Sequence, residues 1–327
     1  MKSEELPWYD DRRTSLGRAP DRSPYSMHGK RVHMSPSDIY AYLDNRIHKQ
    51  NEAKRAVAML TWKALRGIKE NLMLVGPSGC GKTEIFRQLM SVFPAMIEIV
   101  DSSMITNEGW KGDTKWRTIL SSPLYRSSGH KICVLDEFDK LAQPRYSNSE
   151  NVSQSIMSEA LKIFEGTYVN CEDNNVKYQI DTHNISFVCL GAFSNKAQEI
   201  AGKNSKSNIG FGATVETAKP YDKALSVEDI IEFGVMPEFM GRIQSVINLS
   251  PMSQEDYIEL LAKGDYGPIE RLSRDYGVNL SISEETCLEI AQKAYRDGLG
   301  VRGMENQIRN MIDESLFENH EQLTLSF

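Results

Sequence analysis

The segment Gly76-Pro77-Ser78-Gly79-Cys80-Gly81-Lys82-Thr83 constrains the fold of this chain more than any other stretch. It has the spacing G-x-x-x-x-G-K-[ST]. The apolar run 71–75 before it predicts a buried parallel strand, and residues 82–90 repeat apolar side chains at helical spacing. The glycines let backbone N–H groups turn toward an anion, and the helix adds the positive end of its dipole. The segment therefore predicts a phosphate-binding loop. A chance match is the alternative, but it would not require this strand–loop–helix context.

The residues that end this segment suit a nucleoside triphosphate with magnesium. Lys82 is expected to contact the β- and γ-phosphates, and the Thr83 hydroxyl is expected to ligate Mg²⁺. The other loop residues and Glu84 complete the predicted ATP-binding set in this segment.

Residues 131–137 supply a second half of the predicted site, an apolar strand that ends in two carboxylates. Asp136 is predicted to hold magnesium and orient its water ligands. Glu137 is the natural base to polarise the attacking water. The alternative is a strand that merely ends in acids at a solvated edge. Two adjacent acids favour hydrolysis, because a protein that only binds nucleotide could do without the second.

Composition limits the classes of protein to consider. The chain has 327 residues, of which 40% are hydrophobic and 25% charged, and its net charge is −7. These values are typical of a globular protein with two domains, and the negative charge argues weakly against nucleic acid as a partner. No apolar run approaches the roughly 18 residues of a membrane span. The N-terminus lacks a signal-peptide pattern and the five cysteines lack C-x-x-C pairs, so we expect a cytoplasmic protein with no membrane contact and no zinc site.

Three regions are distinguishable along the chain. Residues 1–34 are polar and aperiodic, and they predict a flexible arm. Residues 35–249 alternate strands with helices, the pattern of a large α/β domain with a parallel sheet covered on both faces. From about Pro251 the pattern becomes all helical, with caps at Ser253 and Ser283, and it predicts a small helical domain over 250–327.

Three further motifs resemble those of the Clp family of AAA+ ATPases, in particular ClpX-like unfoldases. They are L-D-E-F-D-K at 135–140, F-G-V-M-P-E-F-M-G-R at 233–242 and G-L-G-V-R-G-M at 298–304. The resemblance runs from about Ser35 to Glu318. It implies a large P-loop AAA+ domain followed by a mostly helical lid, without the zinc-binding N-terminal domain that such proteins usually carry.

The resemblance assigns roles to two arginines. Arg242 matches the arginine finger that reaches the site of a neighbouring subunit, where it neutralises charge on the γ-phosphate. Its alternative is a surface arginine paired with Glu238 or a similar acid. Arg302 matches the lid arginine that senses the γ-phosphate of its own subunit and links nucleotide state to the angle between domains. Its alternative is a helix cap.

Two other family features are only partly matched. The adenine-contacting pattern V-I-G-Q corresponds to Arg46-Ile47-His48-Lys49-Gln50, in which Ile47 is retained and His48 departs. The polar residue that senses phosphate on the fourth strand is Ser194, Asn195 or neither.

The resemblance also predicts two functional loops. Gly109-Trp110-Lys111-Gly112 falls at the axial pore loop G-Y-V-G, where an aromatic side chain grips an extended polypeptide. Its alternative is an exposed tryptophan in a hinge loop. Ile209-Gly210-Phe211 resembles the I-G-F loop that docks on the ClpP peptidase. The alternative there is a loop that folds back onto its own subunit. The family's R-K-H loop is missing, and the acidic segment 170–175 takes its place.

The sequence as a whole therefore predicts an ATP-driven homohexameric unfoldase that delivers protein substrates to a ClpP-type peptidase. One alternative is a remodeller dedicated to a single protein complex, which the altered pore and entrance loops suit. A nucleic-acid motor is a further alternative, since AAA+ folds serve that purpose too.

Overall fold

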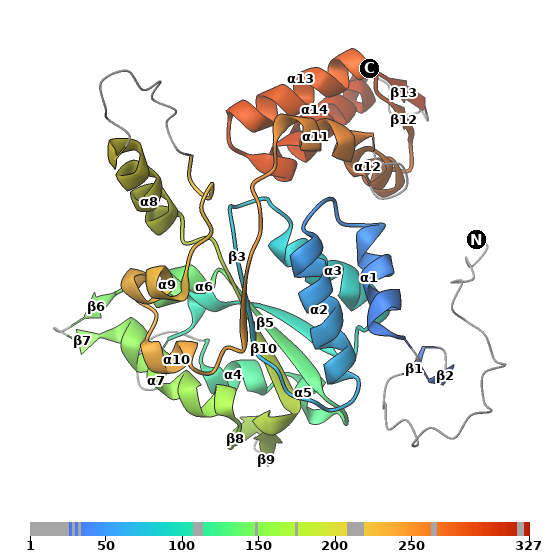
Figure 1. Cartoon of the computed structure of the whole chain (residues 1–327). Coiled ribbons are helices and arrows are strands. Elements are labelled where there is room, and N and C mark those ends of the chain that lie inside the picture. The colour runs from blue at the N-terminus through green and yellow to red at the C-terminus, as the bar shows by residue number, and fades with distance from the viewer. Residues whose placement is uncertain are drawn as a thin grey trace.

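The computed structural model shows an α/β body with a helical unit above it (Figure 1). The residues it describes are 26–27, 30–31, 34–106, 114–147, 150–173, 176–207, 219–262, 267–318 and 324–327.

The body is built on a parallel sheet of five strands. Their spatial order is β11 (Ser245–Asn248), β3 (Leu72–Val75), β10 (Ile185–Gly191), β5 (Lys131–Asp136) and β4 (Ile97–Asp101). β3, β5 and β10 are almost continuously apolar because helices cover both faces of the sheet. All five carboxyl ends lie at one edge, the carboxyl edge, and all five amino ends lie at the opposite edge, the amino edge.

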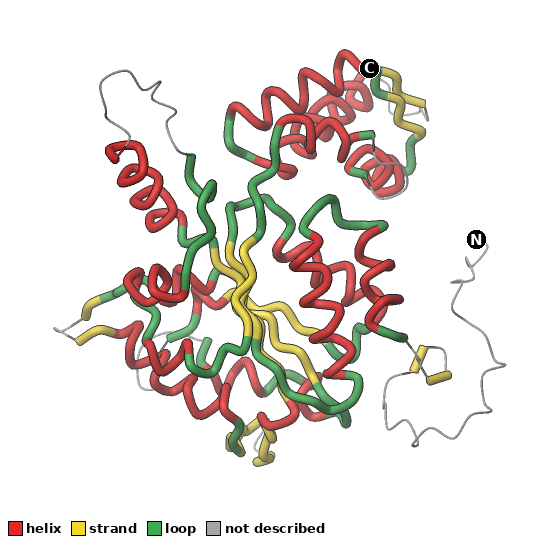
Figure 2. The backbone as a smooth tube through the Cα atoms, in the orientation of Figure 1, coloured by secondary structure: helices red, strands yellow, loops and turns green. Residues whose placement is uncertain are grey.

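Alternate side chains of each central strand enter different cores. In β3, Leu72 and Leu74 pack with α1 (Pro36–Asp44), α2 (Asn51–Ala64) and α3 (Lys82–Val92). Met73 and Val75 face the other way, toward a second set of helices, which are α4 (Trp116–Leu120), α6 (Phe138–Ala142), α7 (Val152–Glu165), α9 (Val227–Phe233) and α10 (Pro237–Met240). Figure 2 shows the strands between these two layers of helices. The predicted doubly covered parallel sheet is confirmed.

Shorter elements surround this body. Two antiparallel hairpins extend from it, one formed by β6 (Tyr146–Ser147) and β7 (Glu150–Asn151) and one by β8 (Tyr168–Asp173) and β9 (Val176–Asp181). The remaining elements outside the lid are β1 (Ser26–Met27), β2 (Lys30–Arg31), α5 (Pro123–Arg126), α8 (Ser194–Ser207) and the 3-10 turns η1 (Ser102–Met104) and η2 (Thr182–Asn184). Among the described residues, no helix is both long and apolar enough to cross a bilayer.

The C-terminal unit, the lid, has its own hydrophobic core. It contains α11 (Gln254–Leu261), α12 (Pro268–Tyr276), α13 (Glu284–Arg296) and α14 (Gly300–Glu318). The predicted mostly helical unit is confirmed, and it also contains one short strand pair, in which β12 (Asn279–Ser281) runs parallel to β13 (Thr324–Ser326). The central leucine of each strand is buried, so a short strand pair closes one side of the lid core.

The passage from body to lid is short. Leu249 belongs to a core cluster of the body and Met252 to that of the lid. Ser253 caps α11 and Ser283 caps α13, each by accepting a hydrogen bond from a backbone N–H three residues on. The domain limit between residues 249 and 250 stays a prediction.

The buried side chain of Asn71 ties the amino edge together. Its Nδ2 donates to the carbonyls of Phe164 (3.1 Å) and Arg242 (2.9 Å), and its Oδ1 accepts from the N–H of Phe187 (2.9 Å). Its own N–H donates to Gln244 Oε1 at 2.6 Å. One amide therefore satisfies backbone groups of three other segments at the point where β3 begins.

We expect Asn71→Leu to destabilise the body strongly. Leucine matches the shape of asparagine but leaves two carbonyls and one N–H buried without partners, at a cost of at least about 3 kcal/mol. Urea unfolding followed by far-UV circular dichroism measures the change. The exposed Asn170→Leu is the control and should shift stability by no more than about 0.5 kcal/mol. Equal midpoints for the two variants would contradict this role of Asn71.

Candidate functional site

The predicted phosphate loop, residues 76–81, joins β3 to α3 at the carboxyl edge. Gly79 and Gly81 have φ of +78° and +96°, which residues with a Cβ rarely adopt. Gly76 is required for another reason, because a Cβ there would lie 2.8 Å from the carbonyl oxygen of Leu249. The loop is thus shaped by backbone requirements at three glycines.

Lys82, the first residue of α3, lies inside the curve of this loop. Its Nζ donates to the carbonyls of Gly76 (2.6 Å) and Pro77 (2.8 Å), and its side chain is 9% exposed. Among the described residues no carboxylate lies within 4.0 Å of this ammonium group. A buried cation that faces only neutral oxygens is a fitting place for an anion.

Thr83 and Asp136 meet although they are 53 residues apart. The Thr83 hydroxyl donates to Asp136 Oδ2 at 2.8 Å, and the other carboxylate oxygen accepts from the N–H of Glu137 at 3.0 Å. Sequence reasoning missed Ser102, which is fully buried and donates to the Asp136 carbonyl at 2.6 Å. Ser102 follows β4, and the register between β4 and β5 pairs Asp101 with Asp136. The alignment of the carboxyl ends of β4 and β5 is the signal that could have identified Ser102.

Glu137 has an unusual backbone and a basic neighbour. Its φ is +57°, and Lys140 donates from Nζ to Glu137 Oε2 at 2.6 Å. Side-chain hydrogen bonding to Glu137 also raises the pKa of Lys140. Strained backbone is often found at functional sites, where the surrounding structure holds a side chain in a fixed direction. Here it turns Glu137 out of the line of β5.

The lid approaches the phosphate loop through α14. Gly300 begins this helix with φ +62°, and its Cα lies 3.3 Å from where a Cβ would stand on Gly79. Arg302 lies exposed in the first turn of α14, two residues further on. The positive end of the helix dipole disfavours a cation there, so the capping alternative for Arg302 has little support.

Two further contacts join the lid to the start of α3 and to the phosphate loop. Arg271 of α12 lies 4.0 Å from Glu84 and also pairs with Glu305. Gln50 donates from Nε2 to the carbonyls of Cys80 (3.3 Å) and Ser250 (2.8 Å), and it accepts from the Ser250 N–H at 3.0 Å. The adjacent Ile47 is 5% exposed and packs into the core beneath.

Arg242 lies far from this group. It precedes β11, whose first residue, Ser245, pairs with Leu72 at the amino edge. Its guanidinium contacts Glu165 at 3.2 Å and the Glu238 carbonyl at 3.4 Å, so the carboxylate partner is Glu165 and not Glu238. The structure therefore does not bring Arg242 together with the phosphate loop of its own chain.

The fourth-strand sensor remains unassigned. Ser194 and Asn195 are exposed at the start of α8, and Ser194 Oγ lies 3.1 Å from the hydroxyl of Tyr221. The nearby Phe193 has φ +53°, and its N–H donates to Asp139 at 3.2 Å. The predicted pore loop (Gly109, Trp110, Lys111, Gly112) and docking loop (Ile209, Gly210, Phe211) lie outside the described residues.

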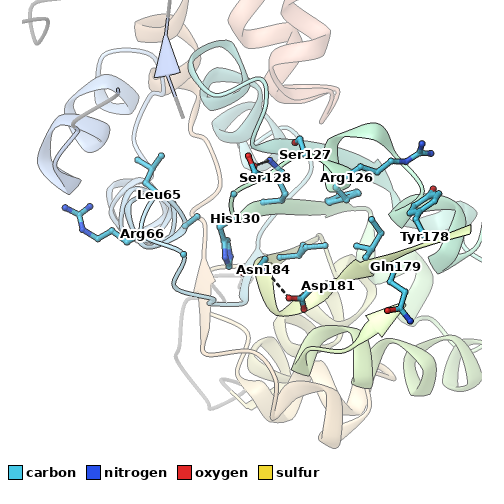
Figure 3. A pocket seen from close by; sticks show the side chains of 17 residues that line it. Leu65, Arg66, Arg126, Ser127, Ser128, His130, Tyr178, Gln179, Asp181 and Asn184 are labelled. Atoms are coloured by element: carbon cyan, nitrogen blue, oxygen red, sulfur yellow. Dashed lines mark hydrogen bonds between the residues drawn. The ribbon is translucent and has the colours of Figure 1, made fainter. Parts of the chain in front are cut away.

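A separate cavity lies away from the phosphate loop. It has a volume of about 650 Å³ and lies at the amino ends of β5 and β10, where Leu65, His130 and Asn184 line it (Figure 3). Burial, together with the charges of Lys69 and Lys131, lowers the pKa of His130 to about 4. The arginines labelled in Figure 3 extend away from its centre. This cavity is not the phosphate site, which is formed by a loop at the opposite edge of the sheet.

Comparisons with known proteins agree with this geometry. Residues 68–246, more than half of the chain, match the family model described as "AAA domain (Cdc48 subfamily)". The chain is also similar to a Treponema denticola protein named "ATP-dependent Clp protease ATP-binding subunit ClpX". The two are 27% identical, and the alignment covers 87% of this chain and 77% of the relative. The predicted ClpX-like resemblance is confirmed, and the chain belongs to the AAA domain family.

Proposed function

We propose that this chain is an ATPase that assembles into a ring and uses ATP hydrolysis to unfold proteins. One observation carries the proposal. Lys82, Thr83, Asp136 and Glu137 converge at the carboxyl edge, whereas Arg242 lies at the amino edge of the same sheet. The first group would bind and hydrolyse ATP, and the position of Arg242 supports completion of the site by a second copy of the chain.

The residues at the carboxyl edge fit magnesium bound together with nucleotide phosphates. Mg²⁺ in such sites takes one or two protein oxygens and completes its shell with phosphates and water. Thr83 and Asp136 offer that pair, since their oxygens already lie 2.8 Å apart. Thr83 and Asp136 would hold the ion, which would supply positive charge to offset that of the phosphates. Lys82 would exchange its carbonyl partners for the β- and γ-phosphates.

Glu137 would act as the general base that accepts a proton from the attacking water. In the described arrangement its carboxylate is paired with Lys140. Both side chains are about half exposed, so this ion pair is weak and breaks easily. The left-handed backbone at Glu137 would keep the side chain directed from the end of β5 toward the phosphates.

Arg242 would act in trans. β3 spans four residues between the amino edge and the phosphate loop, a distance of about 13 Å. An arginine that starts beyond the amino edge cannot bridge this distance along its own subunit. Repeated contact of the amino edge of one copy with the carboxyl edge of the next is head-to-tail, and a head-to-tail contact closes into a ring when its rotation permits.

The similarity to ClpX supports protein unfolding as the use of this ATPase. On that basis six copies would form the ring, Trp110 would contact substrate polypeptide in the pore, and Ile209 to Phe211 would dock on a ClpP-type peptidase. The second candidate is a remodeller that works without a peptidase. The acidic β8–β9 hairpin favours it, because Glu172 and Asp173 stand where ClpX-like proteins carry basic residues.

We expect Glu137→Gln to bind nucleotide normally and to hydrolyse it at least about 100-fold more slowly, because it lacks only the general base. A fluorescent ATP analogue measures binding and released phosphate measures turnover. Lys140→Gln is the control, since it removes the ion pair and keeps the base. Hydrolysis by Glu137→Gln at the wild-type rate would exclude Glu137 as the base.

We expect two inactive variants to restore activity to each other. The Glu137→Gln variant keeps a native Arg242, and the Arg242→Ala variant keeps a native Glu137. In an equimolar mixture about a quarter of the sites would contain both native residues, the statistical share for random head-to-tail assembly. Phosphate release measures the recovery. A mixture as inactive as its components would exclude action of Arg242 in trans.

We expect deletion of Ile209, Gly210 and Phe211 to abolish peptidase-dependent degradation and to leave ATP hydrolysis unchanged, because an apolar loop tip serves docking and not catalysis. Degradation of an unfoldable fluorescent protein in the presence of a ClpP-type peptidase measures the first effect. Lys206→Ala, in the same segment, is the control. Degradation that survives the deletion would exclude this dock, and absence of degradation with the intact chain would favour the remodeller.

A further inference from the structure

Residues 47–50 link three parts of the molecule. They join α1 to α2, contact the phosphate loop through Gln50 and Cys80, and contact the passage to the lid through Gln50 and Ser250. Lys49 and Gln50 have φ of +53° and +59°, so two successive residues with a Cβ adopt the left-handed region. This conformation is unfavourable and persists only where contacts hold it. The amide of Gln50, which is 7% exposed, supplies part of that hold.

Asp256, in the first turn of α11, supplies the other contacts that hold this left-handed backbone. Its carboxylate accepts from Lys49 Nζ (2.5 Å), His48 Nε2 (3.1 Å) and the N–H of Ser253 (2.6 Å), and the residue is 4% exposed. A buried carboxylate with three donors is fully partnered, which burial of a charge requires. The V-I-G-Q pattern carries no charged side chain at the matching positions, whereas this chain has Lys49 there.

Asp256 is ionised at neutral pH. Burial acts to raise its pKa, but hydrogen bonds from Lys49, the Ser253 N–H and His48 outweigh it and lower the pKa to about 2. The other acid near His48 is Glu259, whose Oε2 lies 3.7 Å from Nε2 and whose side chain is 69% exposed. That contact is weak because solvent screens it.

Contacts continue from Asp256 to the phosphate loop. The next residue, Tyr257, is 7% exposed, and its hydroxyl lies 3.6 Å from where a Cβ would stand on Gly300. Gly300 in turn contacts Gly79. The segment that carries Asp256 therefore also positions the start of α14, and with it Arg302, over the phosphate loop.

We propose that Asp256 is a positioning residue for nucleotide binding, whose ion pair with Lys49 and hydrogen bond with His48 hold the lid against the phosphate loop. This inference rests on the proposed function, because it takes residues 76–83 as the nucleotide site. The cluster does not touch the reacting atoms. It fixes the orientation of the lid and thereby sets the affinity for ATP, while the catalytic step depends on Glu137 and Arg242.

The test compares Asp256→Asn with Lys49→Met, which removes the same ion pair from the other side. For each we expect the Kd for a fluorescent ADP analogue to rise about tenfold, equivalent to about 1.4 kcal/mol. The KM for ATP should rise by the same factor, with kcat within about twofold of the wild type. The double variant should be no worse than either single one, since both remove one interaction. Asp256→Glu keeps the charge and should recover most of the affinity.

Two controls separate this role from general damage to the lid. Glu259→Gln neutralises an acid on the same helix and should leave the Kd unchanged. Ser253→Ala removes a cap hydrogen bond of α11 and keeps the ion pair with Lys49, so it should lower the melting temperature without changing the Kd. The proposal is overturned if Asp256→Asn binds as tightly as Glu259→Gln, or if Ser253→Ala weakens binding equally. Failure of the wild-type chain to bind any nucleotide would instead refute the proposed function.

Discussion

The hydrogen bond between Thr83 and Asp136 is the contact on which the rest of the site depends. Thr83 is at the start of α3 and Asp136 at the end of β5, and β10 lies between β3 and β5. Two strand spacings, about 10 Å, therefore separate the strands that lead to them. The side chains meet only because the loop after β3 carries α3 across the carboxyl edge. A strand order with more strands between β3 and β5 would separate the lysine and threonine from the two acids.

The same strand order places the residues proposed for catalysis at opposite edges of the sheet. β3 and β11 run parallel, with Leu72 beside Ser245 and Val75 beside Asn248. The phosphate loop, which follows Val75, therefore lies at one edge, and Arg242, which precedes Ser245, lies at the other. Each edge has its own anchor, since Asn71 bonds the carbonyl of Arg242 and Leu249 packs against Gly76. Under the proposed role of Arg242, one sheet would carry half of the site at each edge and could not complete it alone. Head-to-tail assembly is the arrangement that this proposal calls for.

Local signals in the sequence account for most of what could be predicted. The glycine-rich loop, the strand that ends in Asp136 and Glu137, and the caps at Ser253 and Ser283 each depend on residues close together in the chain. The partners of Asn71 and Asp256 could not be predicted, because their contacts join segments about 90 to 210 residues apart. The pairing of β12 with β13 in the lid was not predicted for the same reason. Each strand is only three residues long, and the burial of its central leucine depends on the other.

The chemistry of the lid contacts bears on how binding and hydrolysis could move it. The lid has its own apolar core, whereas the contacts described here between it and the body are largely polar, through Gln50 with Ser250, Glu84 with Arg271 and the Asp256 cluster. Ion pairs of this kind add little net stability, because loss of hydration offsets their attraction, but they define geometry sharply. A ligand shifts such an equilibrium only by binding one arrangement more tightly than another. Nucleotide phosphates beneath Gly79 and Arg302 would provide that difference, and the Asp256 cluster defines the arrangement from which the lid departs.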